Sequence, residues 1–170
     1  VIVSARYVIR QRLLQVAESV LYLKEHTDEY HIDPEKIVVQ GCSAGGHLAA
    51  NYGIAGNSPF LTKLMGMEND PEQLCVAGLL LCYPVITSGE KAHEESFRNL
   101  LGEQYEEKKG RTFFGKSGDT RYTTTFLWHT ATDETVPWKI HFIFSKPVCS
   151  RVFPQNYIFT RWEDMDFSCK

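Results

Sequence analysis

The sequence lacks the features that define several protein classes. No apolar run approaches the roughly 18 residues that a membrane span needs. The 18 Lys and Arg residues are nearly balanced by 21 Asp and Glu residues, and the two signs are interspersed. These observations predict neither a membrane contact nor a nucleic-acid groove. No signal peptide is visible, although the chain starts at Val1 rather than at Met, which leaves room for a removed leader.

Cysteine is sparse and irregularly placed. The five cysteines form no C-x-x-C pair and no zinc-like spacing, so we expect no metal site. Their odd number argues against a complete disulfide framework. We expect Cys42, Cys75 and Cys82 to be buried free thiols in a reducing, cytoplasmic compartment.

The residues that are present are typical of one globular domain. The chain has 170 residues, of which 43% are hydrophobic and 23% charged. This length is enough for a real hydrophobic core. We therefore treat 1–170 as a single domain.

The segment 41–46, Gly-Cys-Ser-Ala-Gly-Gly, is the most informative stretch. It follows the apolar run 37–39, which predicts a strand, and precedes 47–52, which predicts a helix. A Gly-x-Ser-x-Gly pattern between a strand and a helix is typical of a nucleophile elbow. The alternative is a plain turn that joins the two elements.

In an elbow each residue of the segment has a role. Gly41 and Gly45 let the strand and the helix crowd together, and Ser43 projects from a strained turn as the nucleophile. The amide of Ala44, at the start of the helix, then stabilises an oxyanion. Cys42 is a poorer candidate for the nucleophile, because the elbow puts the central residue at its apex.

The remaining patterns predict alternating helices and strands. Apolar residues recur at helical spacing over 13–26, and 94–101 reads as a helix closed by Gly102. The continuous apolar run 76–82 predicts a strand buried on both faces, and 125–129 predicts another strand. We expect a strand remnant at 1–3 and a loop over 57–71. The alternation favours an α/β fold with a mostly parallel sheet flanked by helices.

Asp133 follows directly after the strand predicted at 125–129. A carboxylate just past the carboxyl end of a strand lies where α/β enzymes place catalytic groups. The alternative is an aspartate that only caps a turn.

Four segments resemble one family. They are 32–50 around the Gly-Cys-Ser-Ala-Gly-Gly motif, 81–87, 97–102 and 126–137 with its Asp-Glu-Thr-Val-Pro end. Together they resemble the bacterial α/β-hydrolase esterase/lipase family related to acetyl-xylan and feruloyl esterases, which includes endo-1,4-β-xylanase-like proteins. The resemblance implies an incomplete α/β-hydrolase fold with Ser43 as nucleophile and Asp133 as the acid that orients a histidine. It implies small acyl esters of carbohydrate as substrates, and no metal or organic cofactor.

The chain departs from this family in two places. The upstream His-Gly-Gly-type loop that completes the oxyanion hole is missing, and so is the histidine in a Gly-x-His-Gly context beyond the aspartate. Read one base earlier, the codons for 162–167 permit that histidine motif. Read one base later, those for 110–124 permit family-like sequence. We therefore interpret 110–124 and 138–170 as out-of-frame stretches; the alternative is a divergent tail with its own fold.

The catalytic histidine is unknown from the sequence. His47 follows the elbow at a scaffold position, and His141 is only eight residues beyond Asp133, too close for the usual loop. The other histidines look structural or exposed: His26, His31, His93 and His129. We expect an ester hydrolase by ancestry whose activity in this chain is weak or absent. The alternative function is a non-catalytic fragment that self-associates into a homo-oligomer through exposed sheet edges.

Overall fold

The fold is taken from a computed structural model. It describes residues 5–67, 70–86, 93–108, 123–130, 133, 135–136 and 157–160. The strand remnant expected at 1–3 lies outside these residues, as do most of 110–124 and 138–170.

The four described strands form one parallel sheet in the order β1-β2-β3-β4. Cys42 lies opposite Cys82, and Cys82 lies opposite Trp128, so the carboxyl ends of the first three strands meet at one edge of the sheet. The strands are β1 (Val38–Cys42), β2 (Gly78–Cys82), β3 (Thr125–Thr130) and β4 (Tyr157–Thr160). The last of these falls within 138–170, the stretch that departs from the family pattern.

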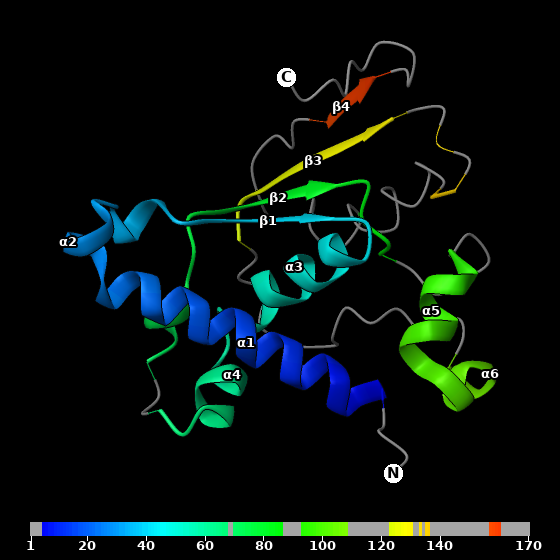
Figure 1. Ribbon diagram of the computed structural model, residues 1–170, viewed down its shortest axis with the longest axis horizontal. Coiled ribbons are helices and arrows are strands. Elements are labelled where there is room, and N and C mark those ends of the chain that lie inside the picture. Colours follow the sequence, from blue (N-terminus) through cyan, green and yellow to red (C-terminus); the bar gives the residue numbers. More distant parts are fainter. Residues whose placement is uncertain are drawn as a thin grey trace.

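Helices α1, α3 and α4 lie on one side of the sheet, and α5 and α6 lie beyond the carboxyl ends of the strands (Figure 1). None of the described helices is long and apolar enough to cross a membrane. The helices are α1 (Ala5–Glu25), α2 (Thr27–Tyr30), α3 (Ala44–Ala55), α4 (Pro59–Leu64), α5 (Glu94–Leu101) and α6 (Tyr105–Lys108). Short 3-10 helices cover Pro34–Lys36, Pro71–Leu74 and Gly102–Gln104.

Most of the predicted elements are confirmed. The helix expected over 13–26 is part of α1, and the one expected over 47–52 lies within α3. The helix α5 has the predicted bounds and ends at Gly102, whose positive φ of 53° suits glycine. The sheet is parallel, as the alternation of elements indicated.

Two predictions about 57–82 were wrong. The segment expected as a loop contains α4, because Pro59 occupies the first turn of a helix, where a missing amide hydrogen is tolerated. Strand β2 is not buried on both faces: Leu79 and Leu81 are 4% and 0% exposed, whereas Leu80 between them is only half-buried. The described helices that pack on the strands gather on one side, so they cover one set of alternating side chains (Figure 1).

The three described cysteines are free thiols but are not buried. Cys42 is exposed, and Cys75 and Cys82 are half-buried. In β1 and β2, the residues at 38, 40 and 42 and at 78, 80 and 82 share the less buried face of the sheet, opposite α3. The apolar run that ends at Cys82 indicates a strand but does not say which face a helix covers.

The hydrophobic core between α3 and the sheet fixes the position of the carboxyl ends of the strands. Small residues of α3 let the helix lie close, and its Ala49 and Ala50 pack on Leu79 and Leu81. A fully buried leucine contributes about 1.5–3 kcal/mol. Two further clusters surround this one: α1 and α4 pack on the outer side of α3, and α5 packs on the loops that follow β2 and β3.

Candidate active site

Ser43 lies between the end of β1 and the start of α3 in a strained conformation. Its φ is 51° and its ψ −119°, a region that residues with a side chain rarely occupy. Such a residue costs on the order of 1–3 kcal/mol. The expected strained turn between strand and helix is therefore confirmed.

The Ser43 side chain does not cap the helix that follows it. A serine at this position ordinarily accepts a hydrogen bond from an amide of the first turn. Here Ser43 makes no such bond. Helix capping therefore does not explain why a serine occupies this strained position.

Two glycines make the tight turn possible. A Cβ added to Gly41 would collide with the Gly45 carbonyl oxygen and lie 2.8 Å from the Gly46 nitrogen. A Cβ added to Gly46 would lie 2.6 Å from the Cβ of Pro84, whereas one added to Gly45 would meet nothing within 4 Å. The prediction that Gly45 itself must be small is corrected: the close contacts are at Gly41 and Gly46, and Gly45 contributes only its backbone.

Main-chain hydrogen bonds fix Ser43 against the end of β2. Its amide donates to the carbonyl oxygen of Cys82 at 3.0 Å. Its own carbonyl oxygen accepts from the amides of Val85, at 3.1 Å, and His47, at 3.2 Å. Ala44 is the first residue of α3, where amides have no acceptor within the helix. Oxyanion binding by the Ala44 amide stays a prediction.

Asp133 lies just past the end of β3, where its amide donates to Thr130 at 3.3 Å. Its Oδ1 accepts hydrogen bonds from the amides of Thr135, at 2.9 Å, and Val136, at 2.8 Å. This is the turn-capping geometry that was the alternative at this position. It also fixes the carboxylate at the same sheet edge as Ser43, with its side chain 16% exposed.

His129 lies beneath Asp133 and is 1% exposed. Its Nε2–H donates to the Val136 carbonyl at 2.7 Å, and Nε2 is 3.3 Å from Oδ2 of Asp133. Burial lowers the pKa of His129, against the weaker opposing effects of the Val136 carbonyl and Asp133. The neutral imidazole of His129 thus contacts both Asp133 and Val136, the two ends of the turn after β3. The sequence analysis did not anticipate this contact, although His129 and Asp133 are only four residues apart.

Tyr83 lies between the end of β2 and strand β3. The sequence analysis did not single out this residue. It follows β2 with a φ of 35°, and its ring meets Trp128 edge to face at 5.7 Å. Burial raises the pKa of Tyr83, and smaller contributions come from Cys42 and Asp133. Its ring therefore packs against β3, beside the end of β2. That Ser43 and Asp133 lie close enough for one histidine ring to bond both side chains stays a prediction.

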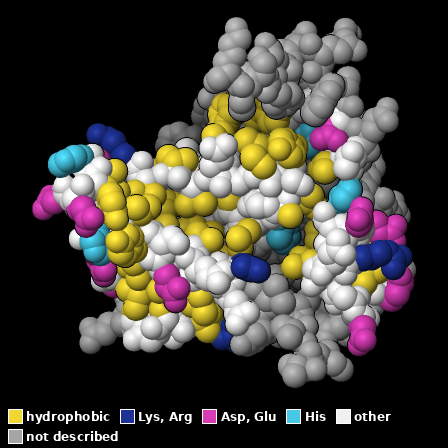
Figure 2. Space-filling model, viewed as in Figure 1, with side chains coloured by type: hydrophobic (Ala, Val, Ile, Leu, Met, Phe, Trp, Pro, Cys, Tyr) yellow, Lys and Arg dark blue, Asp and Glu magenta, His cyan; other side chains and the backbone are white. Residues whose placement is uncertain are grey.

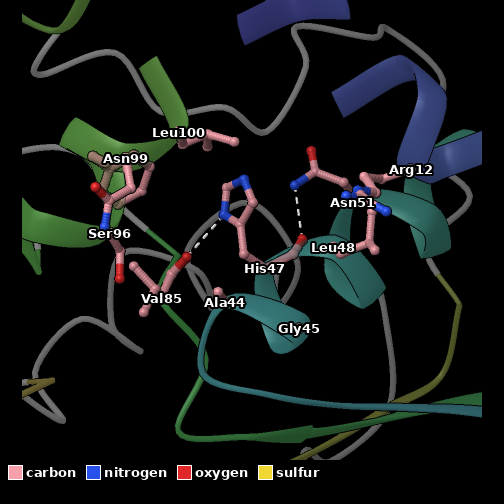
Figure 3. Close-up of a pocket in the computed structure, with 11 residues that line it drawn as sticks. Arg12, Ala44, Gly45, His47, Leu48, Asn51, Val85, Ser96, Asn99 and Leu100 are labelled. Atoms are coloured by element: carbon pink, nitrogen blue, oxygen red, sulfur yellow. Dashed lines mark hydrogen bonds between the residues drawn. The ribbon is translucent and has the colours of Figure 1, made fainter. Parts of the chain in front are cut away.

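A cavity of about 390 Å³ opens beside the start of α3, between α1 and α5. Figure 2 shows the hollow on this face, with apolar side chains around it. The His47 ring points into it, and its Nδ1–H donates to the Val85 carbonyl at 2.8 Å (Figure 3). Burial lowers the pKa of His47. The lining includes Ala44, Gly45, Leu48, Asn51 and Leu100.

The other described histidines do not lie at this edge. His26, between α1 and α2, bonds the carbonyl of Tyr22 in α1, and Nδ1 of His93 caps α5 by accepting from the Ser96 amide. His31 is exposed after α2, and His141 lies outside the described residues.

Within the described residues, no group of three or more His, Cys, Asp or Glu side chains is placed to hold a metal ion.

Comparison with known proteins places these features in a family context. The family model BD-FAE matches residues 8–146. Endo-1,4-beta-xylanase B of Butyrivibrio fibrisolvens is 28% identical over 159 residues, which are 89% of this chain and 24% of that protein.

Solved structures with the same fold were also found. The acetyl ester-xyloside bifunctional hydrolase of Caldicellulosiruptor lactoaceticus superposes with a TM-score of 0.63 at 28% identity, over 88% of this chain and 54% of the other. A lipase/esterase of Lactobacillus plantarum gives a TM-score of 0.66 at 23% identity, over 88% and 59%. The chain thus spans little more than half of these structures and about a quarter of the xylanase. The fold is a partial α/β-hydrolase fold.

The glycine contacts lead to a first prediction. Gly41→Ala is expected to lower the free energy of unfolding by about 2–3 kcal/mol, because the added methyl group meets backbone atoms that cannot move independently. Gly45→Ala is the matched control, since its methyl group has room and alanine favours a helix by up to about 1 kcal/mol. Urea denaturation measures both. Equal losses in the two variants would contradict the assignment of the close contact to Gly41.

The two buried histidines lead to a second prediction. Their pKa values in the folded protein lie below the ordinary value of about 6.5, so on acidification the unfolded chain takes up protons first. The free energy of unfolding should therefore be highest above about pH 7 and fall below pH 6.5, by up to about 1.4 kcal/mol per pH unit for each histidine.

The slope of stability against pH, measured by urea denaturation, tests this second prediction. His129→Gln should make the slope below pH 6.5 shallower. The control Leu81→Ala should lower stability at every pH and keep the slope. An unchanged slope in the His129 variant would show that this imidazole does not carry the effect.

Proposed function

Because the chain belongs to the BD-FAE family, we propose that it is a serine hydrolase of carboxylic esters. The resemblance to esterases related to acetyl-xylan esterases is confirmed by that family and by the relatives found. The observation that carries the proposal is the strained Ser43, whose side chain does not cap α3. Both features are required of a nucleophile that is held out at a strand-to-helix turn.

In this proposal Ser43 attacks the acyl carbon and loses its proton to a histidine. The amide of Ala44 binds the oxyanion, and Asp133 fixes the tautomer of that histidine. The Asp133 carboxylate suits the role because its Oδ1 is held by two amides and the turn around it is supported by His129. No metal or organic cofactor takes part.

We propose small acyl esters of carbohydrate as the substrate class. The support comes from relatives: the Caldicellulosiruptor protein is an acetyl ester-xyloside bifunctional hydrolase, and the Butyrivibrio protein is a xylanase. The cavity beside Ala44 and Gly45 has a mostly apolar lining, which suits an acyl group better than a sugar.

The activity proposed for this chain is weak, because the described histidines near the carboxyl ends of the strands already form hydrogen bonds to main-chain carbonyls. His47 and His129 are both buried, and each donates to a main-chain carbonyl. Oxyanion binding and substrate binding alone accelerate such reactions by about 10³–10⁴ over water, whereas a complete triad adds several powers of ten.

Hydrolysis of p-nitrophenyl acetate gives the third prediction. The purified chain should hydrolyse this ester slowly, and Ser43→Ala should remove the enzymatic part of the rate. Ser58→Ala is the matched control: the Ser58 hydroxyl donates to the Ala55 carbonyl at 2.9 Å after α3, and Ser58 does not line the cavity beside Ala44. An equal loss of activity in the Ser58 variant would contradict the assignment of Ser43 as the nucleophile.

A second arm tests the weak activity and its cause. A version whose stretches 110–124 and 138–170 follow the alternative reading frames, and which is extended upstream by the oxyanion loop, should be faster by several powers of ten. Comparable Ser43-dependent rates in the two versions would refute both the missing base and the frame interpretation.

The exposed edge of β1 supports a second candidate function, a non-catalytic fragment that binds a second copy of itself. Strand β1 is the first strand of the described sheet, and its Val38 is 56% exposed. An edge strand with an exposed apolar residue favours pairing with another strand. A homodimer formed through β1 would continue the sheet from one copy into the next.

The oligomeric state gives the fourth prediction. If β1 pairs with a second copy, Val38→Lys should shift the chain toward the monomer in sedimentation velocity experiments, because a charge on an edge strand opposes pairing. Phe60→Lys is the control, since Phe60 is 51% exposed on α4, away from the sheet edge. A wild-type chain that is monomeric throughout the concentration range would exclude this function.

A further inference from the structure

Cys42 and Cys82 lie directly opposite each other at the ends of two paired strands. They are the last residues of β1 and β2, and the register pairs them. Opposite residues of neighbouring parallel strands point to the same face of the sheet, about 4.8 Å apart in the backbone. This separation falls within the range of about 4.4–6.8 Å between the Cα atoms of a disulfide.

The two thiol groups are neighbours in the sheet. The Cys42 thiol is close enough to Cys82 to contribute to the raised pKa of the Cys82 thiol. Both cysteines are free thiols, and Cys42 is exposed whereas Cys82 is half-buried. Burial, followed by the neighbouring Cys42, raises the pKa of Cys82 to about 11. An oxidant from solution therefore reaches Cys42 first, and Cys82 waits beside it as a thiol.

We propose that Cys42 and Cys82 form a peroxide-sensitive thiol pair that closes into an intramolecular disulfide beside Ser43. The Cys42 thiolate attacks one oxygen of a hydroperoxide, the O–O bond breaks, and the alcohol or water leaves, which gives a sulfenic acid at Cys42. The Cys82 sulfur then attacks the Cys42 sulfur. The sulfenic oxygen leaves as water with the thiol proton, and the S–S bond forms.

The position of the pair makes its oxidation matter to the site. Cys42 precedes Ser43, and the Ser43 amide already donates to the Cys82 carbonyl, so the disulfide adds a covalent tie across an existing main-chain contact. The Cα atoms are within the disulfide range, but side chains of paired parallel strands stand about 4.8 Å apart at Cβ, beyond the roughly 3.5–4.5 Å that a disulfide prefers. The bond is therefore strained, and strained disulfides are readily reduced. The modification is thus reversible, as expected for a redox-sensing pair in a reducing compartment.

Peptide mapping after oxidation gives the fifth prediction. The reduced, purified chain is treated with hydrogen peroxide, blocked with an alkylating agent and digested without reductant. Mass spectrometry should find the peptides of Cys42 and Cys82 joined with the loss of two hydrogen atoms, and dithiothreitol should separate them. This result does not depend on esterase activity, so it stands or falls separately from the proposed function.

Variants sharpen the test. Cys82→Ser should leave a sulfenic acid at Cys42 that dimedone traps, and Cys42→Ser should leave Cys82 alkylated. Cys75→Ser is the matched control: its thiol lies 3.0 Å from the Asn57 side chain, away from the pair, and the linkage should form normally. In the wild-type chain, a Cys42 disulfide with any other cysteine, or over-oxidised Cys42 beside an alkylated Cys82, would overturn the proposal.

Discussion

The close contact between β1 and α3 at Gly41 controls the geometry at the carboxyl ends of the strands. The strand passes so close to the first turn of the helix that a Cβ would meet the backbone of Gly45 and Gly46. The chain must therefore turn within one residue, and that residue, Ser43, takes a positive φ. Pro84 closes the turn from the other side by packing against Gly46. The strain at Ser43 is offset by its main-chain bonds to Cys82, Val85 and His47.

The turn after β3 is stabilised in a different way. Around Asp133 the main chain is held by side chains: the carboxylate accepts from two amides, and His129 donates to the carbonyl of Val136. His129 does this best as a neutral ring, because burial disfavours the imidazolium and the carbonyl needs only one N–H. The neutral ring therefore places no opposite charge beside the Asp133 carboxylate. Tyr83, which follows β2, packs its ring edge to face against Trp128 of β3.

Local patterns were enough to predict most of the described elements and the strained turn at Ser43. The spacing of 41–46 indicated the strained turn, and the helix over 94–101 with Gly102 was predicted with its observed bounds. What failed depends on tertiary contacts. The motif alone does not say that Gly46, rather than Gly45, faces Pro84. The apolar run 76–82 does not say which face of β2 a helix covers, so the thiol of Cys82 was expected to be buried. The contact of His129 with Asp133 requires the turn between them to be known.

The strongest argument for chemistry at Ser43 comes from what its side chain does not do. A glycine would adopt the same φ without strain, and a serine that merely began α3 would accept a bond from the helix's first turn. Neither explanation fits, since Ser43 is a strained serine without a capping bond. The hydroxyl is therefore held out of the helix at a backbone cost of on the order of 1–3 kcal/mol. A base beside it is what would turn this pre-organised hydroxyl into a nucleophile. Of the described histidines near this end of the strands, His47 and His129 each donate to a main-chain carbonyl.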